Sequence, residues 1–209
     1  PDLVVSIPSS DETARRLESL NLPIVSVDQH DVAGVTQSIT LLADICGVSD
    51  RGETLRATVE ARLQAVSDFV AIVDRPRVVV AVGHDIGGGV VRTVWAAGPD
   101  TFYDGVVEIA GATNAVEGGI VRYPELSREG LAALDPDVVL DVVAGIEDRG
   151  LDLETIRDGW RKLTELRAVR EDRVRVLAGD VMVVPGPRLP EMVEAMARAI
   201  HPGLDWDQR

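Results

Sequence analysis

The sequence predicts an α/β fold in which helices cover a parallel sheet. Strand-sized apolar segments alternate with helical ones along the 209 residues, an order typical of such sheets. The strongest apolar runs, 78–82 and 138–143, have the length of strands. A long amphipathic segment separates the first units from the rest. We therefore expect two Rossmann-like lobes joined by a single backbone helix: a first lobe over 1–50, a linking helix over 51–75 and a second lobe over 76–209.

The first lobe begins with a β-α-β unit. Ser10 or Asp11 is a suitable N-cap for its helix, and Gly47 ends the helix that follows the unit. The apolar strand after Pro1-Asp2 has no helix before it, whereas the similar strand after Pro136-Asp137 does. We therefore expect the first lobe to be N-terminally truncated. The expected elements are strands over 3–7 and 23–27 and helices over 10–20 and 31–46.

One apolar stripe defines the linking helix. Its members recur at steps of three and four residues, and Asp74-Arg75-Pro76 ends the pattern. At a rise of 1.5 Å per residue, such a helix spans about 30 Å, enough to run between two lobes. The stripe consists of Leu55, Val59, Leu63, Val66, Val70 and Val73.

The second lobe repeats the alternation of strands and helices. The glycines at 87–89 predict a flexible loop at the carboxyl edge of the sheet, and the tail over 205–209 is expected to fray. Phe102 and Trp160 lie on helices and are expected to pack in the core. The expected strands are 77–82, 93–97, 137–143 and 173–177, and the expected helices are 101–110, 127–134, 153–163 and 190–200.

Composition excludes several kinds of function. The net charge of −14 would repel a phosphate backbone, which argues against nucleic-acid binding. No run approaches the ~20 apolar residues of a membrane-spanning helix. The single cysteine, Cys46, is expected to be a buried, inert thiol.

The sequence offers no catalytic pattern. The glycine run lacks the Gly-Lys-Ser/Thr of a phosphate loop and the spacing of a dinucleotide fingerprint. There is no Gly-x-Ser-x-Gly element, and three scattered histidines give no metal-ligand spacing. His201 is expected at the surface. We predict that the chain is not an enzyme and carries no cofactor and no metal of its own.

A resemblance to a known family rests on the segment 83–136 and on a later proline-rich segment. The order of these motifs resembles the C-terminal lobe of the substrate-binding proteins that feed cobalamin, haem and iron-siderophore ABC importers, the helical-backbone (class III) periplasmic type. The motifs are Gly83-His84-Asp85, Gly87-Gly88-Gly89, Trp95-Ala96-Ala97-Gly98-Pro99, Tyr123-Pro124-Glu125, Ser127-Arg128-Glu129, Leu134-Asp135-Pro136-Asp137 and Gly186-Pro187-Arg188-Leu189-Pro190-Glu191.

The resemblance implies a protein that captures cobalamin or an iron chelate between two lobes with little lobe closure. Flat aromatic rings suit such bulky ligands, and His84 could reach their metal. In well-known cobalamin receptors an aromatic residue follows the first-lobe strand, where this chain has Ile7; this departure weakens cobalamin specifically. The expected ligand-binding residues are Ile7, His30, His84, Asp85, Gly87, Trp95, Tyr123 and Arg188.

The resemblance also implies a partner and a location. A surface glutamate on each lobe of these proteins meets arginines of the permease; here Glu191 is the first candidate and Glu194 the second. The protein is expected to be a periplasmic or extracytoplasmic monomer, with a lipid anchor, if any, in a segment outside this chain. The alternatives are a non-transport α/β enzyme and a truncated regulatory relative of the receptor.

Overall fold

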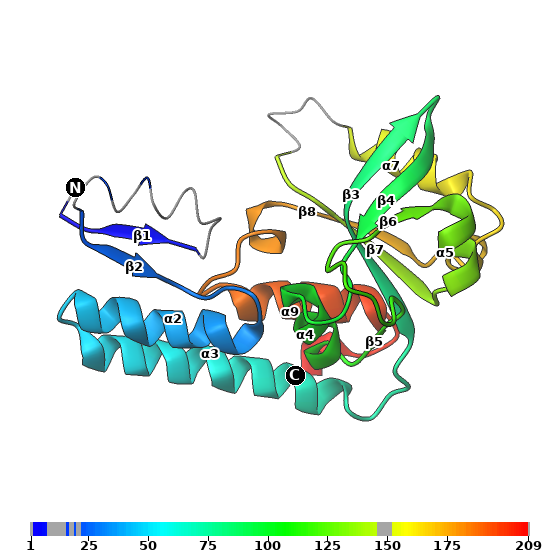
Figure 1. Ribbon diagram of the computed structural model, residues 1–209. Coiled ribbons are helices and arrows are strands. Elements are labelled where there is room, and N and C mark those ends of the chain that lie inside the picture. Colours follow the sequence, from blue (N-terminus) through cyan, green and yellow to red (C-terminus); the bar gives the residue numbers. More distant parts are fainter. Residues whose placement is uncertain (1, 8–15, 17–18, 20–21, 146–151, 209) are drawn as a thin grey trace.

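The computed structural model describes residues 2–7, 16, 19, 22–145 and 152–208 and has two sheets linked by a helical hairpin (Figure 1). A two-stranded sheet lies above helices α2 and α3, and α3 runs on beneath the lobe that holds the larger sheet. The predicted two-lobe α/β architecture is confirmed. Its division at residues 50 and 75 stays a prediction.

The smaller lobe holds a parallel strand pair, β1 (Val4–Ser6) and β2 (Ile24–Ser26). Both predicted strands are present but shorter than expected. The helix predicted over 10–20 lies largely outside the described residues. Helix α2 (Val32–Ile45) begins where predicted, because the Asp31 side chain accepts a hydrogen bond of 2.7 Å from the Gly34 N–H.

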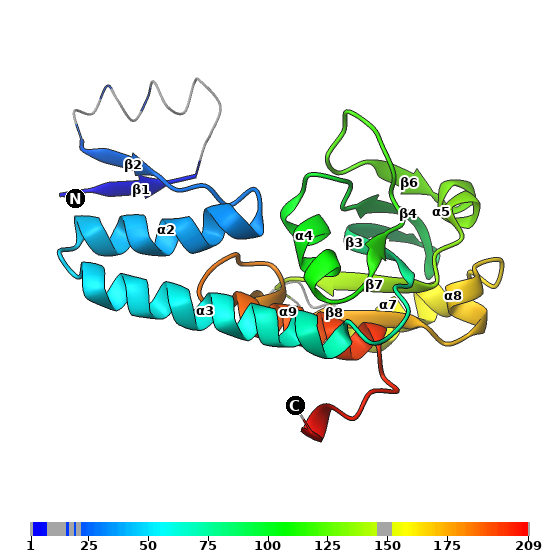
Figure 2. The same ribbon diagram turned by 90° about the horizontal axis from the view of Figure 1, so that it is seen from below.

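Helix α3 (Ser49–Val70) is the linking helix. It starts two residues before the predicted position 51 and ends five before position 75. Near its start it packs closely on α2, because a Cβ at Gly52 would overlap the Ala43 side chain. The absence of a side chain at Gly52 therefore lets the two helices form a tight hairpin (Figure 2).

The buried stripe of α3 joins the core of the larger lobe. Val59, Leu63, Val66 and Val70 pack in one cluster with residues of α4 and α9. Leu55 was predicted to belong to this stripe, but its side chain is 41% exposed, because it lies near the start of the helix, where the larger lobe does not cover it. The stripe therefore begins one turn later than predicted.

The larger sheet is mixed rather than purely parallel. Its strand order is β6-β4-β3-β7-β8, with β5 paired to β3 off this path; β4 and β6 run antiparallel to their neighbours. The strands are β3 (Arg77–Gly87), β4 (Val90–Ala96), β5 (Thr113–Asn114), β6 (Glu125–Ser127), β7 (Val138–Val143) and β8 (Val174–Ala178).

The glycine run forms a tight hairpin turn between β3 and β4, not the flexible loop predicted. Gly88 and Gly89 have φ of +65° and +73°, which is the left-handed region that a two-residue hairpin turn requires. The strand predicted over 93–97 consequently begins earlier, at Val90.

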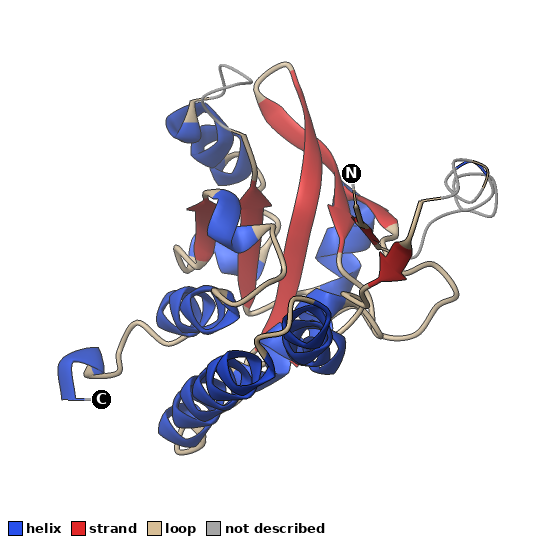
Figure 3. Cartoon of the chain, turned by 90° about the vertical axis from the view of Figure 1, so that its left-hand side faces the viewer, coloured by secondary structure: helices blue, strands red, loops and turns tan. Residues whose placement is uncertain are grey.

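Helices cover both faces of the larger sheet, so the central strands are buried (Figure 3). All six residues of β7 are buried, which explains its mainly apolar sequence. Phe102 and Trp160 lie in the two cores, as predicted. The covering helices are α4 (Phe102–Ile109) and α9 (Leu189–Ile200) on the face shared with α3, and α5 (Arg128–Leu134), α7 (Leu153–Arg161) and α8 (Arg167–Arg170) on the other.

Two predictions about single side chains are wrong. Cys46 is exposed, because it caps the end of α2 where the chain turns toward α3. His201 is buried, and its Nε2 lies 3.2 Å from the carbonyl oxygens of Ala110 and Gly111. His201 therefore ties the end of α9 to the end of α4.

The C-terminal tail is held in place rather than frayed. After η1 (Asp180–Met182) and α9, a short helix η2 (Trp206–Gln208) ends the described chain. The Trp206 ring is buried, with its centroid 4.9 Å from that of Phe69 on α3, and its Nε1–H donates to the His201 carbonyl at 3.1 Å. The tail is therefore part of the contact between α3 and α9.

We expect Leu63→Ala to destabilise the fold, because it empties space in the core that α3 shares with the larger lobe. The expected loss of unfolding free energy is about 2–5 kcal/mol, measured by urea denaturation. Leu55→Ala is the matched control on the same helix; its exposed side chain should cost no more than about 0.5 kcal/mol. Equal losses for the two variants would contradict the assignment of the buried stripe.

Acid should weaken the contact that His201 makes. Burial lowers the pKa of His201 below its ordinary value of 6.5, and this outweighs the carbonyls of Gly111 and Ala110. As the pH falls, His201 therefore takes up a proton in the unfolded chain at a higher pH than in the folded chain. The free energy of unfolding should consequently decrease as the pH drops from 6.5 through the folded pKa. His201→Gln should lack this loss in unfolding curves measured between pH 7.5 and 5. A parallel pH dependence in the variant would assign the loss to other groups.

Candidate functional site

Loops from the two lobes meet at the carboxyl ends of their strands. In Figure 1 the arrows of β1 and β2 point toward the larger lobe. The Gln29 side chain, after β2, donates a hydrogen bond of 3.5 Å to the carbonyl of Pro185, between η1 and α9. Open α/β sheets bind their ligands at the carboxyl ends of strands, so this is the first place to look for a site.

A cavity of about 440 Å³ lies at the carboxyl ends of β3 and β7. Apart from His84, its described lining residues have aliphatic side chains or, at Gly83, none, so only His84 has a side chain that can carry a charge. The lining residues are Val82, Gly83, His84, Ile86, Val142, Val143, Ala144 and Val183.

His84 lies inside strand β3, not in a loop as the sequence suggested, and its side chain is only 9% exposed. Its Nδ1 lies 3.2 Å from Oδ1 and 3.1 Å from Oδ2 of Asp141, a fully buried residue of β7. The hydrogen bond to Asp141 raises the pKa of His84, and this effect outweighs burial. The imidazole ring is therefore held at the cavity wall by a carboxylate behind it.

Trp160 completes the support behind His84. This buried indole of α7 donates from Nε1 to Asp141 Oδ2 at 2.7 Å.

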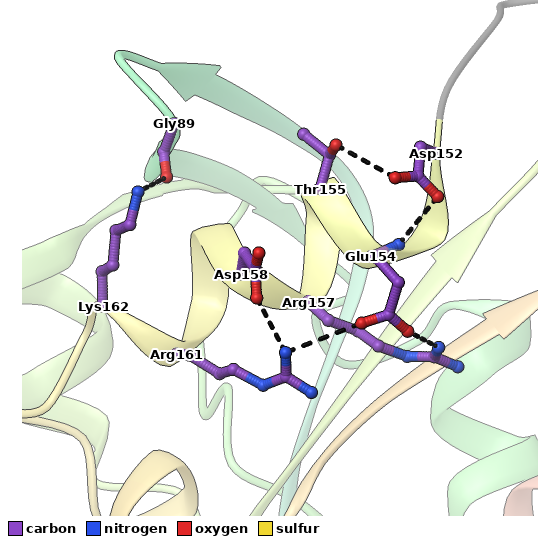
Figure 4. A network of polar contacts seen from close by, with 8 residues as sticks. All are labelled: Gly89, Asp152, Glu154, Thr155, Arg157, Asp158, Arg161 and Lys162. Carbon is purple, nitrogen blue, oxygen red and sulfur yellow. Dashed lines mark hydrogen bonds and ion pairs between the residues drawn. The ribbon is translucent and has the colours of Figure 1, made fainter.

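Helix α7 also holds the β3–β4 hairpin, because Lys162 Nζ at its end donates to the Gly89 carbonyl at 3.0 Å (Figure 4). Asp152 caps the start of the helix by accepting from the Glu154 N–H at 3.1 Å.

Trp95 and Tyr123 are partly exposed on one face of neighbouring segments. Trp95 pairs with Gly83 across the β3–β4 ladder, and a Cβ at Gly83 would lie 3.3 Å from the indole ring. The two aromatic side chains are 41% and 42% exposed, and burial raises the pKa of Tyr123. Gly83 also lines the cavity, so the Trp95 ring lies beside one residue of the cavity wall.

The next two predicted residues lie farther along the hairpin. Asp85 is exposed on β3. Gly87 lies beneath the Arg92 side chain, and any Cβ there would overlap the guanidinium. The overlapping atoms are the flexible end of an exposed arginine side chain, which can move aside, so this approach does not by itself require glycine.

The remaining predicted contacts lie in the loops of both lobes. Ile7 follows β1 and is 55% exposed. His30 is half exposed, with Nδ1 2.7 Å from Asp28 Oδ1, and its backbone N–H holds the pKa of Asp28 below the usual value. Arg188 is exposed directly before α9. The Gln29–Pro185 bond places the His30 loop beside the segment that leads to Arg188.

The two predicted docking glutamates both have partners within the chain. Glu191 Oε1 lies 4.0 Å from Arg62 Nη1 on α3, and Glu194 accepts from Arg198 at 2.8 Å. Both pairs are partly exposed, so the acids can still meet another protein. Their role in docking stays a prediction.

Asp141 is the residue of this site that sequence reasoning missed. The sequence feature that could have revealed it is an acid in the middle of the apolar run Val138–Val143, because a charge inside a buried strand needs a partner.

Among the described residues no three His, Cys, Asp or Glu side chains gather as a metal site. The arrangement is suited to holding a large apolar ligand against one oriented imidazole.

Comparison with known proteins identifies the family. Residues 1–181 match the periplasmic binding protein family. The chain is 24% identical, over 97% of its length and 62% of the relative's, to an uncharacterized ABC transporter substrate-binding lipoprotein, YvrC, of Bacillus subtilis. It is 28% identical, over 96% of its length and 53% of the relative's, to a cobalamin-binding protein of Halobacterium salinarum. The chain thus spans between about half and three fifths of the length of these curated relatives.

Among solved structures, a periplasmic heme-binding protein from Pseudomonas aeruginosa superimposes with a TM-score of 0.81 at 27% identity, covering 98% of this chain and 74% of that one. The relatives are binding proteins by name, in agreement with the expectation that the chain is not an enzyme. On the family match and the two-lobe architecture together, the chain belongs to the periplasmic binding protein family and has its helical-backbone (class III) fold.

Proposed function

We propose that the chain is the substrate-binding part of an ABC importer that captures cobalamin or an iron chelate, either haem or a siderophore complex, between its two lobes. The observation that carries this proposal is the cavity at the carboxyl ends of β3 and β7, lined by aliphatic residues and His84, with the Trp95 ring beside Gly83 of its wall. Planar macrocycles need apolar contact over a wide area and few polar contacts. Loops of the smaller lobe, including Ile7 and His30, supply the opposite wall.

The ligands of the relatives support this class of substrate. One curated relative is a cobalamin-binding protein, and a solved structure of similar fold is a heme-binding protein. Ile7, where cobalamin receptors were expected to have an aromatic residue, favours an iron chelate over cobalamin.

Delivery to a membrane permease follows from the same proposal. One relative is a substrate-binding lipoprotein of an ABC transporter. No helix within the described ranges is long and apolar enough to cross a membrane. We place the protein outside the cytoplasm, as a monomer that presents its ligand to the permease and carries no cofactor of its own.

We expect Trp95→Ala and Tyr123→Ala each to weaken ligand binding about 5- to 30-fold, the effect of losing roughly 1–2 kcal/mol of ring contact. The measurement is a titration with haemin, cyanocobalamin and a ferric hydroxamate, followed by ligand absorbance and tryptophan fluorescence.

Ile72→Ala is the control for these variants. Ile72 is 80% exposed just beyond the end of α3, next to neither the cavity nor the aromatic pair, and its loss should leave affinity unchanged. Failure of the wild-type protein to bind any of the three probes would overturn the proposed function.

Charge reversal tests permease docking. We expect Glu191→Arg to weaken binding to the cognate permease in nanodiscs about tenfold, mainly through the association rate, because a charge at an interface rim steers encounter. Ligand affinity should not change. Glu60→Arg, on the exposed side of α3, is the matched control. If both variants bind the permease as the wild type does, docking does not use α9.

A further inference from the structure

We propose that Asp141, held in place by Trp160, is a positioning residue that selects the tautomer of His84, so that Nε2 presents its lone pair to the cavity and receives an electron-pair acceptor of the ligand. That acceptor is either the open coordination position of a chelated metal or an N–H or O–H group. This inference rests on the proposed function, since it concerns how the same cavity holds its ligand.

The hydrogen bonds behind the ring allow one arrangement of protons. An indole N–H can only donate, so Asp141 Oδ2 accepts from Trp160 at 2.7 Å. An ionised carboxylate can only accept, so the short approach of 3.1–3.2 Å to His84 requires a proton on Nδ1. At a pH above the raised pKa of His84, the imidazole is neutral and carries one proton, which leaves Nε2 with a free lone pair.

The free nitrogen is accessible from the cavity. No hydrogen-bond partner of Nε2 exists among the described residues, and Nε2 is not one of their buried, unpartnered side-chain atoms. His84 lines the cavity, although its side chain is only 9% exposed. The accessible part of the ring is therefore the part opposite the carboxylate.

The fold itself gives no reason for a carboxylate at position 141. Its neighbours on β7 are aliphatic and buried, and an aliphatic side chain would complete that core without the cost of a buried charge. Among the described residues, the hydrogen-bond partners of the Asp141 side chain are His84 and Trp160. A buried acid that joins one cavity-lining imidazole to one indole donor is explained by the orientation of that imidazole.

Asp141→Asn provides the sharpest test, because it should reverse the tautomer while it preserves the shape of the side chain. Trp160 still donates, so the amide oxygen must face the indole and the amide NH₂ must face His84. Nδ1 then becomes the acceptor, and Nε2 carries the proton. Nitrogen-15 NMR of the imidazole should show a deprotonated Nε2 in the wild type and a deprotonated Nδ1 in the variant.

Haemin affinity should fall at least about tenfold in Asp141→Asn. Loss of a negative charge would by itself favour the anionic haemin, so a decrease cannot come from the changed net charge. Adding Trp160→Phe to Asp141→Asn should partly restore affinity, because the amide can then turn its oxygen to His84. Trp160→Phe alone is the matched single variant: the carboxylate still accepts from Nδ1, so its nitrogen-15 spectrum should keep a deprotonated Nε2.

The outcomes separate this inference from the proposed function. If wild-type protein binds no probe, the proposed function fails. If it binds haemin and Asp141→Asn reverses the tautomer without loss of affinity, only the present inference is overturned. A wild-type spectrum with the proton on Nε2 would overturn it without any variant, even if Asp141→Asn does not fold.

A metal-free porphyrin identifies the acceptor. When Asp141→Asn loses affinity for haemin but not for metal-free protoporphyrin, the lone pair binds the metal. When it loses affinity for both, the lone pair accepts a hydrogen bond from the ligand.

Discussion

The packing of α3 against the larger lobe determines the geometry of the whole molecule. Within its described residues the smaller lobe has a two-stranded sheet, and such a sheet has little stability of its own. Its helix α2 packs on α3 through the close contact of Gly52 with Ala43, and α3 buries Leu63 and Val66 in the core of the larger lobe. The cavity and the loops that face it keep their relative positions because one continuous helix belongs to both packing units.

The sequence patterns that predicted the fold were those in which buried residues recur at a regular spacing. The stripe on α3 and the strand-length runs of β3 and β7 were readable because each follows the period of its element. Leu55 shows the limit of such reasoning, since periodicity gives the direction of a side chain but not whether another element covers it. Cys46 and His201 were mispredicted for the same reason: whether they are buried depends on contacts distant in sequence.

The candidate site was predictable in its parts but not in its arrangement. Sequence reasoning singled out His84 and Trp95, yet it placed His84 in a loop, because the glycines after it looked like the end of a strand. Strand β3 instead continues through His84 to the tight turn at Gly88-Gly89. The parallel register places Ala81 opposite Asp141, and an irregularity in the pairing with β4, between Ala81 and Gly83, precedes the histidine. Register is not readable from one strand alone.

The combination of an aliphatic cavity and one supported imidazole defines what the site can discriminate. Apolar contact alone separates ligands of similar size weakly, because the hydrophobic effect has no direction. A buried polar group discriminates more strongly. A ligand that leaves this group without a hydrogen bond binds more weakly by the full free energy of desolvating the group. In this cavity that group is His84, and its direction is set by Asp141, which lies behind the wall and outside the reach of the ligand. Selectivity at this site would then depend as much on a residue that never touches the ligand as on those that do.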